Sequence, residues 1–262
     1  MQIPKNPFKA AIHAGEMQTG CWLGLAEPYL AEISGSAGFD WVVVDAEHAP
    51  NDLRSIVTHL QILDGLPSHA VVRPPIGETW MIKQYLEAGA QTVLVPMVES
   101  AEQARQLVRA ISYPPHGTRG VGSALGRSSR FTAIPDYLNT AHAELCLLVQ
   151  IETRAGVAAL DDILAVDGID GVFIGPADLA ADMGHIGNPG APEVHATIIT
   201  CMRKIIAAGT AAGILTTDAK LQSECAEIGA RFIATSIDVT LFANAMRGAA
   251  TQTNAHLKGS GK

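Results

Sequence analysis

Basic residues are few in this sequence, and it has no long apolar runs. Its 262 residues include 18 lysines and arginines against 26 acidic residues, for a formal net charge of −8 at pH 7. The basic residues are scattered, which argues against nucleic acid or an anionic membrane as a partner. No apolar run approaches the ~20 residues that cross a bilayer, and the N-terminus has no apolar signal core. We therefore expect a cytoplasmic protein whose partners are small molecules.

Paired cysteines and abundant aromatic residues are also missing. No two cysteines have the CxxC spacing of a metal or redox motif, and we expect all four to be buried free thiols in a reducing compartment: Cys21, Cys146, Cys201 and Cys225. Aromatic residues make up only 5% of the chain, so the core must be mostly Ala, Val, Ile and Leu.

Short β-rich runs alternate with helical patterns along the whole chain. The pattern predicts eight strands, at 20–26, 41–47, 69–75, 92–98, 145–152, 171–175, 212–218 and 231–236. Several of the intervening helical segments begin with Pro, Asn, Asp or Ser and end with Gly, as helix caps require. Eight such units predict an α/β protein with a (β/α)8 TIM-barrel fold. A doubly wound sheet is the alternative, but it usually has fewer strands, and no GxGxxG or P-loop motif is present.

The expected domain organisation is one barrel domain over residues 1–254, followed by a flexible polar tail over 255–262. One connection, residues 113–144, is much longer than the others. A loop of that length in a compact barrel is usually functional. The sequence leaves the role of its first part, residues 113–130, open.

Acidic residues stand at the ends of two neighbouring strands, where a TIM barrel carries its active site. Strand alternation puts Gln150 and Glu152 on one face of the fifth strand, and Asp178 follows the sixth. Two carboxylates that converge in a low-dielectric barrel mouth repel each other, and a divalent cation removes that repulsion. Mg²⁺ is typically held by one or two carboxylates plus water and substrate. A metal site is therefore predicted, with helix capping by the two acids as the alternative.

Other polar residues follow the second, third and sixth strands. Asp45 near His48 permits a carboxylate–imidazole pair, although this segment could simply begin the next helix. Arg73 ends a buried strand and needs either a structural carboxylate or a bound anion as partner. The free N–H groups of Ala177 and Asp178, after a Gly-Pro turn, could cradle a carboxylate or merely face water.

Two absences narrow the chemistry. The loops after the seventh and eighth strands lack the glycines of a barrel phosphate site, so the substrate is not expected to be phosphorylated. No lysine falls at a strand end, which leaves a Schiff-base mechanism without a nucleophile. A metal must then serve as the electron sink. Trp22, on the first strand, is expected in the core or in the pocket wall.

Six long motifs carry a resemblance to a known family: "GFDWVVVDAEHAPND", "VVRPP", "IKQYLEAGAQTVLVPMVESAEQA", "YPPHGTRGVGSALGR", "VQIETRAG" and "GIDGVFIGPADL". Over about residues 7–248 the chain resembles the HpcH/HpaI aldolase family, and most of all its members that cleave 4-hydroxy-2-oxoheptanedioate. These are metal-dependent (class II) pyruvate aldolases. The resemblance implies cleavage of 4-hydroxy-2-oxo acids to pyruvate and an aldehyde.

The resemblance also implies roles for individual residues. Glu152 and Asp178 would bind Mg²⁺, Mn²⁺ or Co²⁺, Arg73 would bind the keto oxygen and stabilise the enolate, and Asp45 with His48 would do acid–base work. We expect His48, acting through a water, as the base, with a metal-bound hydroxide as the alternative. The predicted substrate-binding residues, including the amides that hold the pyruvate carboxylate, are Arg73, Gln150, Gly175, Pro176, Ala177, Asp178, Trp22 and Leu215.

The resemblance further implies a homohexamer, a dimer of trimers with the last helix exchanged between neighbours. In the family an acidic residue of one subunit approaches a neighbour's site, and here that residue is Glu87 rather than Asp. Three alternatives remain: a sugar-acid aldolase of the 2-dehydro-3-deoxyglucarate type, a malyl- or citramalyl-CoA lyase, and a non-catalytic barrel that binds 2-oxo acids. The CoA enzyme would need a basic nucleotide-binding patch, which the sequence does not show.

Overall fold

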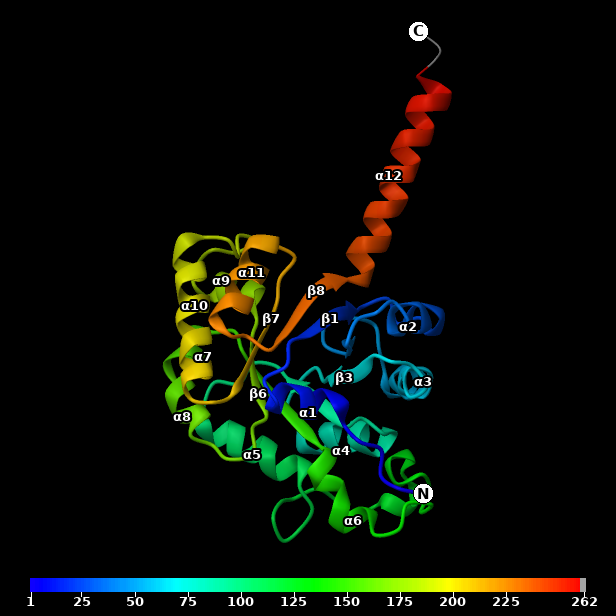
Figure 1. Cartoon of the computed structure of the whole chain (residues 1–262), viewed down its shortest axis with the longest axis vertical. Coiled ribbons are helices and arrows are strands. Elements are labelled where there is room, and N and C mark those ends of the chain that lie inside the picture. The colour runs from blue at the N-terminus through cyan, green and yellow to red at the C-terminus, as the bar shows by residue number, and fades with distance from the viewer. Residues whose placement is uncertain (260–262) are drawn as a thin grey trace.

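The structure is a computed structural model that describes residues 1–259. Eight parallel strands close into a barrel in sequence order, so the predicted TIM-barrel fold is confirmed (Figure 1). Each strand overlaps the run predicted for it. The strands are β1 (Gln18–Leu23), β2 (Trp41–Asp45), β3 (His69–Arg73), β4 (Thr92–Val95), β5 (Cys146–Ile151), β6 (Gly171–Ile174), β7 (Ala211–Leu215) and β8 (Phe232–Ile237).

Helices surround the barrel and fill its connections. They are α1 (Pro7–His13), α2 (Pro28–Gly35), α3 (Leu53–Leu63), α4 (Thr79–Ala88), α5 (Ala101–Ile111), α6 (Tyr137–Thr140), α7 (Arg154–Ala158), α8 (Leu160–Leu164), α9 (Pro176–Asp182), α10 (Pro192–Ala207), α11 (Ala219–Ile228) and α12 (Asp238–Lys258). The sequence did not predict α1, because seven residues with only two buried apolar side chains give no helical periodicity.

The core has two layers, one inside the barrel and one between strands and helices. Along β5, Cys146 and Leu148 belong to the inner cluster, whereas Leu147, Val149 and Ile151 belong to the outer one. This is the predicted strand alternation. It turns the next residue of the inner set, the buried Gln150, toward the barrel interior.

Most of the buried core is Ala, Val, Ile and Leu, as expected, and a small aromatic cluster lies inside the barrel. Phe8 of α1 packs against Trp41 and Phe232, with ring centroids 5.5 and 5.7 Å apart. Phe173 of β6 contacts both Phe232 and Trp22, which extends the aromatic cluster to β1. Large rings fill the wide barrel interior, while the outer layer is aliphatic. All four cysteines are buried and free, as expected.

Helix α12 leaves the barrel and projects into solvent (Figure 1). It continues through Lys258, beyond residue 254 where we placed the end of the folded domain, because no Gly or Pro interrupts residues 249–258. Residues 260–262 of the expected tail lie outside the described part of the chain. Three apolar side chains of α12 are exposed, at 54% to 57%: Leu241, Phe242 and Met246.

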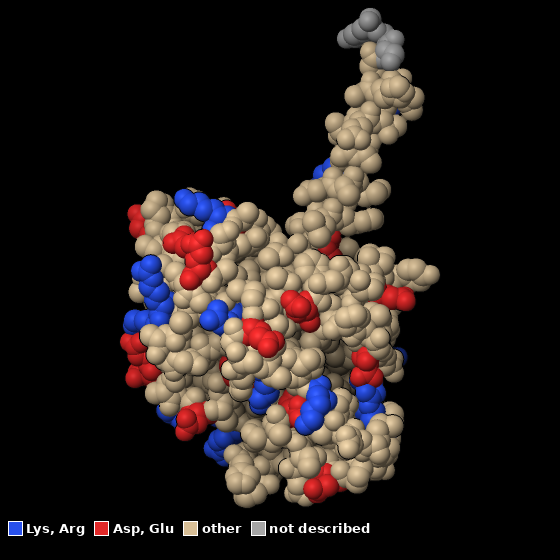
Figure 2. Space-filling model, viewed as in Figure 1, with Lys and Arg blue, Asp and Glu red and all other residues tan. Residues whose placement is uncertain are grey.

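The surface carries mixed charge. Figure 2 shows acidic and basic side chains interspersed on one face of the barrel and few charges along α12. Within residues 1–259, no helix combines the length and the apolar character needed to cross a membrane.

Candidate active site

Arg73 is the centre of a buried ion-pair network at the end of β3. Asp45 lies opposite it in the β2–β3 register. The guanidinium donates from Nε to Asp45 Oδ1 at 2.9 Å and from Nη2 to Oδ2 at 2.6 Å. Its Nη1 lies 2.8 Å from Glu47 Oε2, and its Cζ lies 4.8 Å from the ring centroid of Trp22. Arg73 thus has two carboxylate partners and an aromatic support.

The two carboxylates respond differently to this environment. Burial pushes the pKa of Asp45 upward, but the hydrogen bonds and charge of Arg73 outweigh it, so this pKa is lowered. The indole N–H of Trp22 also donates to Asp45, at 3.2 Å. Glu47 has a raised pKa because burial and the nearby charge of Glu152 prevail over Arg73. Asp45 therefore stays ionised and holds the guanidinium of Arg73 in place.

The expected Asp45–His48 pair is not the arrangement that forms. Asp45 is engaged by Arg73 and Trp22, and it reaches His48 only through the backbone N–H, at 3.5 Å. The imidazole Nε2 lies 3.7 Å from Glu47 Oε2 instead, and the His48 side chain is 62% exposed. The strand register explains the difference, because it sets Arg73 directly opposite Asp45 whereas His48 lies beyond the end of β2.

Glu152 stands just past the end of β5 and is 1% exposed. Its Oε1 accepts from the backbone N–H of Met97 at 2.9 Å, and its Oε2 accepts from the side-chain amide of Gln150. Burial raises the pKa of Glu152 above its ordinary value, and the negative charge of Asp178 adds to that effect. Asp178 is exposed, in the first turn of α9. The two predicted metal ligands are therefore close enough to interact electrostatically.

Gly175 makes room for this arrangement. A Cβ at this position would overlap Glu152 Oε2 and would lie 2.9 Å from the Glu152 Cβ and 3.0 Å from Gln150 Nε2. Any larger residue would push the carboxylate aside. Close approach of the backbone is thus the physical reason for glycine at the end of β6.

The donor set fits a hard divalent cation. Glu152 and Asp178 supply carboxylate oxygens, and the buried Gln150 Oε1 has no hydrogen-bond partner among residues 1–259. Within the described residues, no group of three or more His, Cys, Asp or Glu converges as a metal cage. A site with two carboxylates and open positions for water or substrate is typical of Mg²⁺ rather than of structural zinc.

A cavity of about 260 Å³ opens beside the Gly-Pro turn. Pro176 and Ala177 line one side, and Leu215 lines it from β7. Trp22 lies in the core, one of the two positions expected for it: it is 5% exposed and supports Asp45 and Arg73 from inside the barrel.

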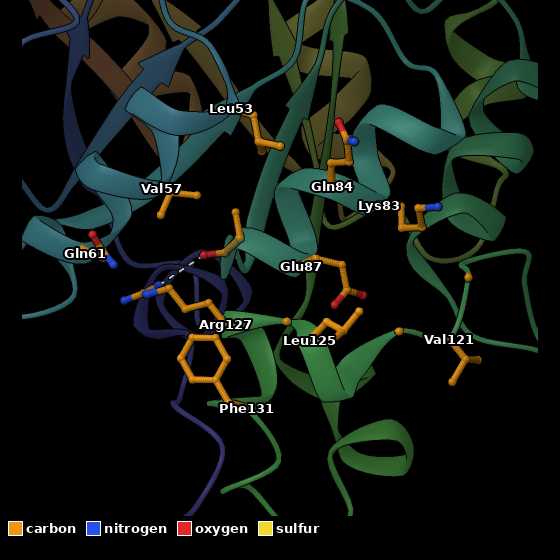
Figure 3. A pocket seen from close by; sticks show the side chains of 14 residues that line it. Leu53, Val57, Gln61, Lys83, Gln84, Glu87, Val121, Leu125, Arg127 and Phe131 are labelled. Carbon is orange, nitrogen blue, oxygen red and sulfur yellow. Dashed lines mark hydrogen bonds between the residues drawn. The ribbon is translucent and has the colours of Figure 1, made fainter.

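Glu87 lies elsewhere, in a larger cavity of about 550 Å³ between α3, α4 and residues 120–131 (Figure 3). Its Oε1 is 3.2 Å from Nη2 of the fully buried Arg119. Exposed apolar residues border the same cavity, namely Val121, Leu125 and Phe131. The structure therefore does not bring Glu87 into the barrel mouth of its own subunit.

Two residues of the mouth were absent from the predicted site. Glu47 shares strand parity with Asp45, and its position beside a strand-end arginine was a readable signal. Met97 could not have been found from sequence. It binds Glu152 through its backbone N–H, and its φ of 55° is a conformation that no residue pattern indicates.

Comparisons with known proteins identify the family of the chain. A hydroxypyruvate/pyruvate aldolase of Roseovarius nubinhibens is 57% identical over 94% of this chain and 96% of its own length. A 4-hydroxy-2-oxo-heptane-1,7-dioate aldolase of Salmonella paratyphi B is 52% identical over 98% of both chains. An HpcH/HpaI aldolase/citrate lyase family protein of known structure, from Burkholderia cenocepacia, superposes with a TM-score of 0.91 at 36% identity, covering 95% of this chain and 100% of its own. Residues 18–245 match the family model of the HpcH/HpaI aldolase/citrate lyase proteins, and the chain belongs to this family.

Proposed function

We propose that this carbon–carbon lyase is a divalent-metal-dependent aldolase that cleaves 4-hydroxy-2-oxo acids to pyruvate and an aldehyde, and that also catalyses the reverse addition. One observation carries the proposal. Glu152 is buried at the end of β5 and packs directly against Gly175, the residue that precedes the first turn of α9 with Asp178. The buried Arg73 ends β3 at the same mouth of the barrel.

In this proposal Glu152 and Asp178 hold Mg²⁺, Mn²⁺ or Co²⁺. When bound, the ion supplies positive charge that stabilises the enolate oxygen of the departing pyruvate. Gln150 holds Glu152 in place through its side-chain amide, and Gly175 leaves space for both side chains.

Arg73 is proposed to bind the 2-oxo oxygen and to stabilise the negative charge that develops there. A guanidinium has five N–H donors. Nε and Nη2 each donate one N–H to Asp45, and Nη1 forms an ion pair with Glu47, which leaves at least one N–H on each terminal nitrogen for the substrate. Because the guanidinium is already fixed, it needs no reorganisation when charge develops.

The substrate carboxylate is proposed to bind the N–H groups of Ala177 and Asp178. These groups lie in the first turn of α9, where backbone donors have no partner within the helix. Pro176 begins this turn, and its ring fixes φ at the point where the backbone must face the substrate. Leu215 would form the apolar wall opposite.

His48 is proposed as the base, acting through a water molecule. It removes the proton of the C4 hydroxyl, the C3–C4 bond breaks, and the electron pair passes into the pyruvate enolate while the aldehyde leaves. The exposed imidazole beside Glu47 suits a group that exchanges protons with solvent. Asp45 then contributes indirectly, by holding Arg73 and the backbone N–H of His48.

The proposed assembly is a homohexamer, a dimer of trimers, with α12 exchanged between neighbours. The exposed apolar side chains of α12 and of the cavity in Figure 3 support such contacts. The 64% to 90% exposure of Val121, Leu125 and Phe131 would be costly in an isolated subunit. In this hexamer Glu87 of one subunit would approach the active site of a neighbouring subunit. Sedimentation analysis of the full chain, which distinguishes monomer from hexamer, tests this assembly.

Pyruvate release from 4-hydroxy-2-oxo acids, coupled to lactate dehydrogenase with and without EDTA, tests the function. We expect activity that EDTA abolishes and added Mn²⁺ restores. The names of the relatives suggest comparing pyruvate with hydroxypyruvate as donors in the reverse reaction. Arg73→Ala should be inactive, whereas Arg105→Ala, which removes an exposed ion pair with Glu102, should be active. Binding of 2-oxo acids without pyruvate release would instead identify a non-catalytic barrel.

A further inference from the structure

We propose that Gln103 is a positioning residue that holds the β4–α5 turn in a strained conformation, so that the backbone of Met97 fixes Glu152 for metal binding. This inference rests on the metal role proposed above for Glu152. Neither Gln103 nor Met97 belongs to the proposed ligand set.

Met97 adopts a left-handed conformation, with φ of 55°. Residues other than glycine rarely adopt it, because Cβ then crowds the backbone. The side chain is 44% exposed, so its burial does not explain the strain. The conformation does bring the Met97 N–H within 2.9 Å of Glu152 Oε1. Strain that persists at a functional site is typically held there by the surrounding structure.

Gln103 supplies that restraint from the first turn of α5. Its Nε2 donates to Met97 O at 3.1 Å, and its Oε1 accepts from the Glu99 N–H at 2.9 Å. One side-chain amide therefore spans the turn and binds the backbone on both sides of Val98. We call these two side-chain hydrogen bonds the Gln103 clamp. The Ser100 side chain caps α5 by accepting from the Gln103 N–H at 3.2 Å, which fixes the backbone position of Gln103.

The same turn is tied to β5 on both sides of Glu152. The Val98 N–H donates to Gln150 O at 3.0 Å, and the Thr153 hydroxyl donates to the Glu99 side chain at 2.8 Å. Loss of the Gln103 clamp would let Met97 relax toward an ordinary backbone conformation. Its N–H would then turn away, and Glu152 would lose one of the two donors that orient its oxygens.

Mn²⁺ titration by calorimetry tests the clamp without relying on turnover. Gln103→Glu keeps the acceptor for Glu99 but replaces the donor to Met97 with an oxygen, and Gln103→Leu removes both contacts. We expect about 10-fold weaker Mn²⁺ binding in both, as is usual when an outer hydrogen bond to a metal ligand is lost. Gln106→Glu is the matched control, because this exposed glutamine lies on the same helix and its side-chain amide donates to Glu102. It should bind within about twofold of wild type, since it leaves every contact of Glu152 in place.

A second variant separates positioning from general damage to the fold. Met97→Gly keeps the N–H donor, and glycine adopts positive φ without strain. The double variant Met97→Gly, Gln103→Leu should therefore regain most of the lost Mn²⁺ affinity. Unchanged affinity in both Gln103 variants, or no recovery in the double variant, would overturn the inference.

Glu152→Gln distinguishes this failure from failure of the proposed function. If Glu152→Gln loses Mn²⁺ binding while the Gln103 variants bind like wild type, only the clamp is wrong. If Glu152→Gln itself binds Mn²⁺ like wild type, the metal site is wrong and the clamp has no ligand to position.

Discussion

Arg73 and Asp45 face each other across neighbouring strands and form a buried two-bond ion pair, with distances of 2.9 and 2.6 Å. The pair sets the orientation of the guanidinium that we propose to bind the 2-oxo oxygen. Its carboxylate remains ionised despite burial because Arg73 lowers the pKa of Asp45.

Asp45→Asn should keep the shape of the site but loosen Arg73, because a neutral amide accepts at only one atom. We expect kcat to fall about 100-fold, as small displacements of a catalytic group commonly cause. Loss of one partner from a buried ion pair should also lower the free energy of unfolding by about 3 kcal/mol. Coupled pyruvate assays and urea denaturation measure both effects. Glu102→Gln, which breaks an exposed pair with Arg105, should change stability by less than about 1 kcal/mol.

Gly175→Ala should damage the metal site directly. Its Cβ would overlap the Glu152 carboxylate and crowd the amide of Gln150, so one of these side chains must move. We expect a loss of stability of about 1–3 kcal/mol, typical of overpacking, together with weaker Mn²⁺ binding. Gly65→Ala is the control, because the nearest atom to its Cβ would be 4.0 Å away. Equal Mn²⁺ affinity in the two variants would contradict the proposed crowding.

Glu152 should make the stability of the metal-free protein fall with rising pH. Its pKa in the folded protein is raised above the ordinary 4.5, chiefly by burial. The folded state therefore holds its proton more tightly, and this stabilising contribution is lost as pH rises from 4.5 through the raised pKa. Glu152→Gln should flatten that part of the pH–stability curve in urea denaturation experiments. A wild-type curve that rises relative to the variant over this range would refute the assignment.

A bound divalent metal ion should restore the stability that the metal-free protein loses as pH rises. Mn²⁺ at 100 times its dissociation constant should stabilise the wild-type protein by about 2.7 kcal/mol, if it binds only the folded state. The same concentration should leave Glu152→Gln unchanged in thermal denaturation. Stabilisation of both proteins by equal amounts would place the ion at another site.

His69 should make the protein sensitive to acid. It is partly buried at the N-terminal end of β3, where this burial lowers its pKa from 6.5 to about 4. Its Nε2 lies 2.8 Å from Thr92 Oγ1, and its ring stacks on Phe8. Because the unfolded chain binds this proton more readily, about 3 kcal/mol of stability should be lost as pH falls from 6.5 to about 4.

His69→Gln should remove this acid-dependent loss, because glutamine does not titrate and can still reach Thr92. Urea denaturation at a series of pH values between 4 and 7 measures it. His116→Gln, on an exposed loop, controls for the substitution itself. An unchanged acid slope in His69→Gln would show that another group is responsible.

Much of the site could be predicted because it depends on local patterns. Alternation along β5 places Gln150 toward the interior and Glu152 at the mouth, and the Gly-Pro turn after β6 delivers Asp178 to the neighbouring position. In a closed parallel barrel the carboxyl ends of all strands meet on one face, so acids at two adjacent strand ends must approach each other.

The partners of the charged groups could not be predicted in the same way. The spacing in the sequence predicted a contact between Asp45 and His48. In the structure Asp45 instead binds Arg73, and Glu47 lies beside the imidazole of His48. The register between β2 and β3 decides this, and it depends on contacts between residues 28 positions apart in the chain. Likewise, no residue pattern indicated the left-handed conformation of Met97 or the hydrogen bond from Gln103 to its carbonyl oxygen.

The sequence by itself determined the order of strands and helices, the barrel that follows from it, and the acids at the strand ends, because these depend on residues close together in the chain. The tertiary structure alone decided which carboxylate holds Arg73, how the Met97 amide reaches Glu152, and why Gly175 must lack a side chain. Those outcomes depend on distances of a few ångströms between strands, which hydrophobic periodicity does not specify.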